Sequence, residues 1–205
     1  MIFDMDGVLL DSEAAWDRAR EDYTRESGGT WSESAQRDMM GMSSTEWSRY
    51  MHEELGVAAE PEQISSAVVD RMLAGYRERL PLIDGAVAAV ERMAERYGTL
   101  GLASSANRPL IDLALRESGL DRYFKATVSS EEVERGKPAP DVYLEAARRL
   151  GADPAETAAV EDSHNGILSA HAAGMRVIAI PNPVFPPGDD ALARADRVLD
   201  SIADL

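Results

Sequence analysis

Two aspartates separated by one residue, Asp4 and Asp6, directly follow the apolar run of residues 1–3. Successive side chains of an extended strand alternate between its faces, so both carboxylates leave the strand on the same side. Gly7 then lets the chain turn away. Such a pair could bind a metal ion or act as nucleophile and acid/base, but it also suits an ordinary polar turn. Its partners further along the chain must decide between these interpretations.

Polar pairs also end two later apolar runs, Ser104-Ser105 at one and Glu161-Asp162 at the other. Each pair alone has a structural explanation, because serine is common in turns and acids favour the positive end of a helix. Together with the first pair, however, they place four acids at one crevice. These acids would repel one another strongly unless a divalent cation were bound among them.

The residue types favour a hard metal ion. The chain has no cysteine, and its three histidines, His52, His164 and His171, do not form a spaced pair of ligands. Oxygen-only ligands favour Mg²⁺. The histidines themselves receive no role from the sequence.

A lysine supplies the positive charge that a phosphoryl group needs. Lys137 is one of only two lysines and stands between glycine and proline in residues 136–141, Gly-Lys-Pro-Ala-Pro-Asp. Pro138 and Pro140 stiffen the backbone on one side of it, which would hold the amine in place. An exposed loop lysine remains the alternative interpretation.

Helices and strands alternate after about residue 81, which predicts a parallel α/β sheet. Residues 11–80, by contrast, show only helical spacing. The first strand is so short that it must lie in the middle of the sheet. The expected fold is therefore a Rossmann-like core of residues 1–12 and 81–205 with an inserted helical cap domain of residues 13–80. Expected strands are 99–104, 125–129, 157–161, 175–180 and one near Val198, and expected helices are 86–97, 109–118, 140–150 and 164–173.

Composition limits the possible partners of the 205-residue chain. Its net charge of -16 opposes binding to nucleic acid or an anionic membrane, although a small phosphorylated substrate is compatible with a local cation. No apolar run approaches the length of a membrane span, and there is no signal peptide pattern. We therefore expect a cytoplasmic protein that is a monomer or a weak homodimer.

The ordered motifs Asp-x-Asp-Gly-Val, a serine after a strand, Gly-Lys-Pro-x-Pro-Asp and Glu-Asp-Ser-x-x-Gly resemble those of the haloacid dehalogenase superfamily. The resemblance spans nearly the whole chain and is to the branch with a helical cap, which contains β-phosphoglucomutase and sugar-phosphate phosphatases. It implies that Asp4 is a nucleophile that forms an aspartyl phosphate, and that Asp6 is the general acid/base.

The resemblance also implies a ligand set. Mg²⁺ would be held by the Asp4 carboxylate, the Asp6 backbone carbonyl, Glu161 and Asp162. The same resemblance implies that the phosphoryl oxygens would be bound by Ser104, the Ser105 amide and Lys137.

Hydrolysis is favoured over dehalogenation and over mutase activity. Dehalogenases of the superfamily lack an acid at the position of Asp6. β-Phosphoglucomutases resemble this chain but carry a histidine and an arginine where Trp16 and Ser44 stand here. Residues 11–19 resemble those of sugar-phosphate phosphatases instead. The expected function is a Mg²⁺-dependent phosphatase acting on a small phosphorylated metabolite, a sugar phosphate.

A cap of this kind would choose the leaving group while moving on linkers near residues 11–14 and 80–84. The expected substrate-facing residues are Trp16, Met42, Ser43, Ser44 and Trp47. Ordinary helix packing is the alternative interpretation for the two tryptophans.

Two other classes of function remain open. One is a mutase, and the other is a receiver-like phosphoacceptor without turnover, which also uses clustered acids, Mg²⁺, a hydroxyl residue and a lysine. Asp6 and the helical insertion oppose the receiver, because a signalling acceptor needs neither an internal acid/base nor a lid. A purely interacting protein is disfavoured because every motif residue is present.

Overall fold

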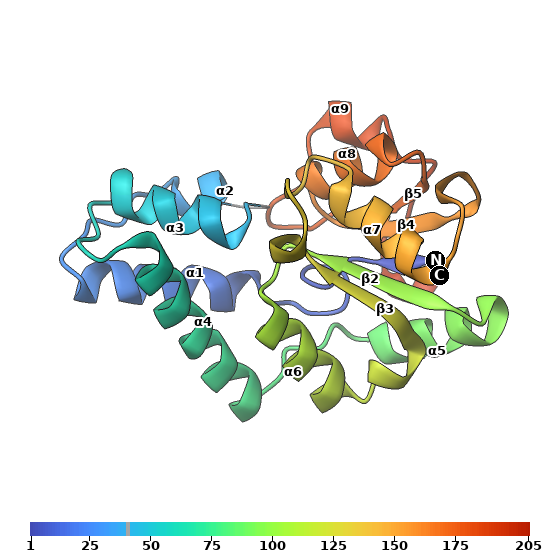
Figure 1. The fold of residues 1–205 in the computed structure, drawn as a ribbon, viewed down its shortest axis with the longest axis horizontal. Helices are drawn as coiled ribbons and strands as arrows, with labels where there is room; N and C mark the ends of the chain where they lie inside the picture. Colours follow the sequence, from blue (N-terminus) through green and yellow to red (C-terminus); the bar gives the residue numbers. More distant parts are fainter. Residues whose placement is uncertain (40–41) are drawn as a thin grey trace.

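Six parallel strands form one sheet in the computed structural model, which describes residues 1–39 and 42–205 (Figure 1). The order across the sheet is β3-β2-β1-β4-β5-β6, so the first strand has a neighbour on each side, as predicted. Both of its residues are fully buried. The strands are β1 (Ile2–Phe3), β2 (Leu100–Ser104), β3 (Phe124–Ser129), β4 (Ala158–Glu161), β5 (Arg176–Ala179) and β6 (Arg197–Val198).

Helices cover both faces of this sheet, which confirms the expected α/β class (Figure 1). Ile2 and Phe3 illustrate the alternation of the pleat, because each packs into a different one of the two apolar clusters that flank the sheet. α5 and α6 pack on one face, and α7 and α8 on the other. The helices of this part are α5 (Ala86–Tyr97), α6 (Arg108–Ser118), α7 (Asp141–Leu150), α8 (His164–Ala172) and α9 (Asp189–Leu192).

Of the helices that the structure describes between β1 and β2, the first four pack on one another to one side of the sheet (Figure 1). They are α1 (Glu13–Glu26), α2 (Ala35–Met39), α3 (Ser44–Glu53) and α4 (Pro61–Glu78), and we refer to them as the helical segment. Capping boxes begin two of them: Ser43 pairs with Glu46 at α3, and Glu60 pairs with Gln63 at α4. Satisfied N-termini of this kind define where the helices start.

The two connections between the helical segment and the sheet run side by side. Leu10 forms an antiparallel bridge with Leu82, and the Asp11 N–H donates to the Pro81 carbonyl at 2.8 Å. These paired connections overlap the two linkers expected from the sequence. Any movement of the helical segment relative to the sheet would therefore require the backbone to bend at these connections.

The expected elements of residues 81–205 agree with the structure to within about two residues at each end. The sequence patterns missed short elements, because a single turn has too few residues to show a period. These are α9 and the four 3₁₀ turns Asp121–Tyr123, Ser130–Glu132, Pro154–Glu156 and Ile202–Asp204. Within the described residues, no helix is both long enough and apolar enough to span a bilayer.

Candidate active site

Three buried carboxylates meet at the carboxyl edge of the two central strands. Asp4 follows β1 directly and stays in the sheet, because its N–H donates to the Val160 carbonyl of β4 at 2.9 Å. Glu161 ends β4, and Asp162 follows it. One oxygen of each acid lies within 4.8 Å of the others, and all three residues are buried. Burial raises the pKa of Asp4 to about 8, against the opposing effect of Lys137.

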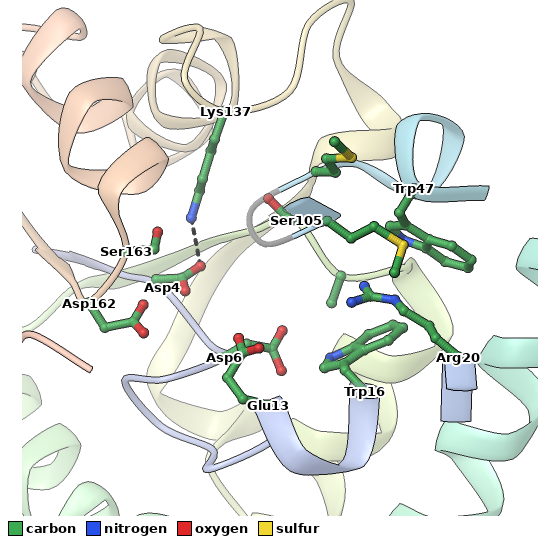
Figure 2. A pocket seen from close by; sticks show the side chains of 13 residues that line it. Asp4, Asp6, Glu13, Trp16, Arg20, Trp47, Ser105, Lys137, Asp162 and Ser163 are labelled. Atoms are coloured by element: carbon green, nitrogen blue, oxygen red, sulfur yellow. Dashed lines mark hydrogen bonds and ion pairs between the residues drawn. The ribbon is translucent and has the colours of Figure 1, made fainter. Parts of the chain in front are cut away.

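Lys137 lies among these acids although it is 133 residues from Asp4 in the chain (Figure 2). Its Nζ donates to an Asp4 oxygen at 2.7 Å and to a Glu161 oxygen at 2.6 Å. Its side chain is 3% exposed. Burial alone would lower the pKa of the ammonium group, but Asp4 and Glu161 outweigh that effect and raise it. The lysine is therefore a fixed cation beside Asp4, and the alternative of an exposed loop lysine is wrong.

Glu161 is turned toward protein groups that donate hydrogen bonds to it. One carboxylate oxygen accepts from Lys137 and, at 2.7 Å, from the Tyr143 hydroxyl. The other accepts from the Asp162 N–H at 3.1 Å and from Ser163. Gly166 makes room for this carboxylate, because a Cβ there would fall 2.0 Å from it. Glu161 thus holds Lys137 in place as well as belonging to the acidic cluster.

Asp162 has a different environment. A Cβ on Gly7 would lie 1.9 Å from its Oδ2, so the backbone of the first motif approaches this carboxylate as closely as only glycine permits. The φ of +81° at Gly7 is a second reason for glycine. Burial, followed by the charges of Glu161 and Asp4, raises the pKa of Asp162 well above its usual range. A carboxylate so placed suits a divalent cation, which would offset the repulsion.

Asp4, Lys137 and Asp162 line a cavity at the carboxyl edge of the sheet. Asp6 lies on the side of this cavity nearer the helical segment (Figure 2). One of its oxygens accepts from the Ser12 hydroxyl at 2.5 Å and from the Tyr76 hydroxyl at 3.4 Å. Burial raises the pKa of Asp6, while the hydrogen bond from Ser12 opposes the rise. A carboxyl group whose pKa is raised can hold a proton and release it, which is what a general acid requires.

The two serines at the end of β2 have separate roles. The Ser104 hydroxyl is fully buried and accepts from the Ala106 N–H at 3.0 Å, so it closes the turn after the strand. Ser105, in contrast, lines the cavity with Ala106. Its buried Oγ has no hydrogen-bond partner among the described residues. This free hydroxyl faces the same cavity as Lys137 and could hydrogen-bond a phosphoryl oxygen.

The expected substrate-facing residues divide into two groups. Trp16, Met42 and Trp47 line the cavity. Ser43 caps α3 by donating to Glu46 at 2.7 Å, and the Ser44 hydroxyl donates to Glu131 of the sheet part at 3.0 Å. Neither serine is among the described residues that line the cavity.

Three cavity residues of the helical segment were not expected from the sequence: Glu13, Arg20 and Met39. The signal for two of them was present, because residues 13, 16 and 20 share one helix face, and Trp16 was already a candidate. The histidines lie elsewhere: His52 contacts the backbone of residues 57 and 59, and His171 lies near Arg194. His164 begins α8 with Asp190 nearby.

The match to protein families agrees with this geometry. The model of the haloacid dehalogenase-like hydrolase family matches residues 1–180, and the chain belongs to that family. Within it, the chain is a phosphoric monoester hydrolase.

Similar proteins extend over the whole chain. Hexitol phosphatase B of Escherichia coli is 34% identical over 100% of this chain and 92% of its own length. (DL)-glycerol-3-phosphatase 2 of Arabidopsis thaliana is 30% identical over 100% and 87%, respectively. Among solved structures, CbbY of Rhodobacter sphaeroides in complex with phosphate is 28% identical, with a TM-score of 0.87, over 100% of this chain and 94% of that one.

Proposed function

We propose that the protein is a Mg²⁺-dependent phosphatase that hydrolyses a sugar phosphate through an aspartyl phosphate on Asp4. The observation that carries the proposal is the contact of Lys137 with Asp4, deep in the cavity and beside Asp162. A buried cation, together with a divalent ion held by the acids at this point, would bind a phosphoryl group next to a carboxylate that can attack it.

In the first step, an Asp4 oxygen attacks phosphorus and the bond from phosphorus to the leaving oxygen breaks. Asp6, protonated, gives its proton to that oxygen, and the alcohol departs. In the second step, Asp6 takes a proton from water as the water oxygen attacks phosphorus, which releases phosphate and restores Asp4. The raised pKa of Asp6 supports its role as a proton donor. Lys137 and the Ser105 hydroxyl neutralise and orient the phosphoryl oxygens.

The acids fit a hard divalent cation, because all donors are oxygen and the Asp162 carboxylate is buried beside two others. Asp4, Asp162 and the Asp6 backbone carbonyl would hold Mg²⁺, with Glu161 adjoining. When bound, Mg²⁺ supplies positive charge that favours ionised Asp4 and offsets the repulsion between this carboxylate and the substrate phosphate. Glu161, through its bond to Lys137, positions the lysine next to that group.

We also propose that residues 13–80 form a cap over a core of residues 1–12 and 81–205. Trp16 and Trp47 would then cover the leaving group, and the paired connections at Leu10 and Leu82 would act as the hinge. The hydrogen bond from Ser44 to Glu131 supports a closed arrangement, because it joins the helical segment to the sheet part.

The test measures phosphate release from p-nitrophenyl phosphate and a panel of sugar phosphates, with Mg²⁺ or with a chelator. We expect multiple turnovers only with Mg²⁺, and losses of at least about 1,000-fold for Asp4→Asn and Asp6→Asn. Asp70→Asn, an exposed acid of α4, is the control for a change of charge. Near-normal turnover in either active-site variant, while folded, would refute the assigned roles.

Two other results would point to different functions. Phosphorylation of the protein once, without repeated release of phosphate, would indicate a phosphoacceptor. Faster formation of glucose 6-phosphate than of free phosphate, from β-glucose 1-phosphate with a bisphosphate activator, would indicate a mutase.

A further inference from the structure

One arginine of the helical segment is buried at the cavity without a full set of partners. Arg20 is 6% exposed and lines the cavity. Its Nη1 donates to the Gln36 side chain at a long 3.3 Å, and its buried Nε has no partner among the described residues. Burial lowers the pKa of Arg20 to about 10, so the guanidinium is still charged at neutral pH. An incompletely paired buried cation is costly unless something else supplies acceptors.

The arginine is held rigidly between two aromatic rings (Figure 2). Its guanidinium carbon is 4.7 Å from the centre of the Trp16 ring and 5.1 Å from that of Trp47. The two rings lie 6.1 Å apart at 60°. Stacking of this kind stabilises the cation while leaving its edge free to donate hydrogen bonds. Packing alone explains the position of the side chain but not why its buried Nε has no partner among the described residues.

A glutamine connects Arg20 to an acceptor on the same side of the cavity. Gln36 accepts from Arg20 and donates to a Glu13 oxygen at 2.9 Å. Glu13 and Arg20 lie on one face of α1 and both line the cavity with Asp6. The helical segment therefore presents the Arg20 guanidinium as a donor and Glu13 as an acceptor to the leaving group of the substrate.

The charges around the cavity argue against an anionic leaving group. Three carboxylates, Asp4, Glu13 and Asp162, stand against two cations, Arg20 and Lys137, among the described lining residues, and Asp6 is neutral when it is protonated for the first step. A bound divalent cation would offset this excess of negative charge. The negative charge of the reacting phosphoryl group would in turn balance the charge of that cation. Glu13 would repel a second phosphate or a carboxylate on the leaving group. Neutral hydroxyl groups, which both donate and accept, match the arginine and the glutamate together.

We propose that Arg20, positioned by Gln36 and the two tryptophans, selects a neutral polyhydroxylated leaving group by donating to one of its hydroxyl oxygens, while Glu13 accepts from another hydroxyl. The inference rests on the proposed phosphatase function and specifies its substrate class. Trp16 and Trp47 would pack against the C–H groups of the same polyol.

The experiment compares wild type and Arg20→Gln on glucose 6-phosphate and on its monodeoxy analogues. We expect wild type to lose about 10-fold or more in kcat/KM on at least one analogue, because removing one hydroxyl leaves a buried donor unpaired. Arg20→Gln should lose about 10- to 100-fold on glucose 6-phosphate and be almost indifferent to removal of that same hydroxyl. A merely structural arginine would lower activity on parent and analogue alike.

Arg18→Gln is the matched control, because Arg18 is an exposed arginine two residues away on α1. Thermal unfolding reports whether each variant is folded. If Arg20→Gln does not fold, Arg20→Lys serves instead: it keeps the charge, loses the planar fork and should show a reduced sensitivity to the same hydroxyl.

Three outcomes overturn the inference. One is a wild type that is insensitive to every single deoxygenation. Another is a folded Arg20 variant that keeps the wild-type sensitivity. The third is a preference for a bisphosphate, such as fructose 1,6-bisphosphate, which would assign Arg20 to a second anion. Failure of wild type to hydrolyse even p-nitrophenyl phosphate would instead overturn the phosphatase function itself.

Discussion

Replacement of Gly7 by alanine tests how closely the first motif must approach the acids of β4. The added Cβ would fall 1.9 Å from the Asp162 Oδ2, whereas ordinary contacts begin near 3.4 Å. The carboxylate must therefore retreat by about 1.5 Å. The φ of +81° adds backbone strain of about 1–2 kcal/mol. A shift of this size at a catalytic group typically costs about 100-fold in rate.

The assay is phosphate release as a function of Mg²⁺ concentration, together with urea unfolding of the metal-free protein. For Gly7→Ala we expect a fall in kcat of about 100-fold and a rise of at least about 10-fold in the Mg²⁺ concentration that gives half-maximal rate. The displacement of Asp162 explains both effects, because this acid is a proposed ligand.

Gly98→Ala is the matched control for backbone strain. Gly98 has a φ of +73° and no neighbouring atom within 4 Å of a built Cβ, so it has the strain without the clash. It should lose about 1–2 kcal/mol of stability and keep its kinetics. The reasoning is refuted if Gly7→Ala also keeps normal kcat and normal Mg²⁺ dependence.

Two further predictions concern charges. Methionine is close to lysine in shape, and Lys137→Met should reduce phosphate release at least about 1,000-fold. Without Mg²⁺ this variant should also unfold more easily, because Asp4 and Glu161 would be buried without a cation. A folded variant with near-normal turnover would contradict this. Glu132 is partly buried, which opposes ionisation, yet hydrogen bonds from Arg108, Ser129 and Arg149 lower its pKa from 4.5 to about 2. Because the folded pKa is the lower one, this stabilisation is present above pH 4.5 and is lost as pH falls toward 2. When the free energy of unfolding is measured in urea, Glu132→Gln should therefore lose less stability than wild type between about pH 6 and pH 3, by about 1 kcal/mol at most. If the free energies of the two proteins fall in parallel with pH, the ion pairs of Glu132 contribute nothing.

The sequence by itself determined the architecture of the sheet and the set of residues at its carboxyl edge. Strands and helices after residue 81 alternate clearly, and the carboxyl ends of parallel strands meet at one edge. Asp4, Ser105 and Asp162 are therefore brought together by topology, whatever the details of packing. Lys137 was identified by the motif around it, and its contact with Asp4 needed the fold.

Only the tertiary structure decided which side chains turn toward the cavity. Ser104 and Ser105 are neighbours in the same motif, yet one hydroxyl closes a turn and the other has no partner in the part of the chain that the structure describes. Successive residues of a helix differ by about 100° in direction, so spacing shows that Glu13 and Arg20 share a face, but only packing decides what that face contacts. Gln36, which links these two residues, comes from a different helix. The chemistry at the strand ends was thus encoded locally, whereas the proposed selection of the leaving group depends on how the helical segment packs.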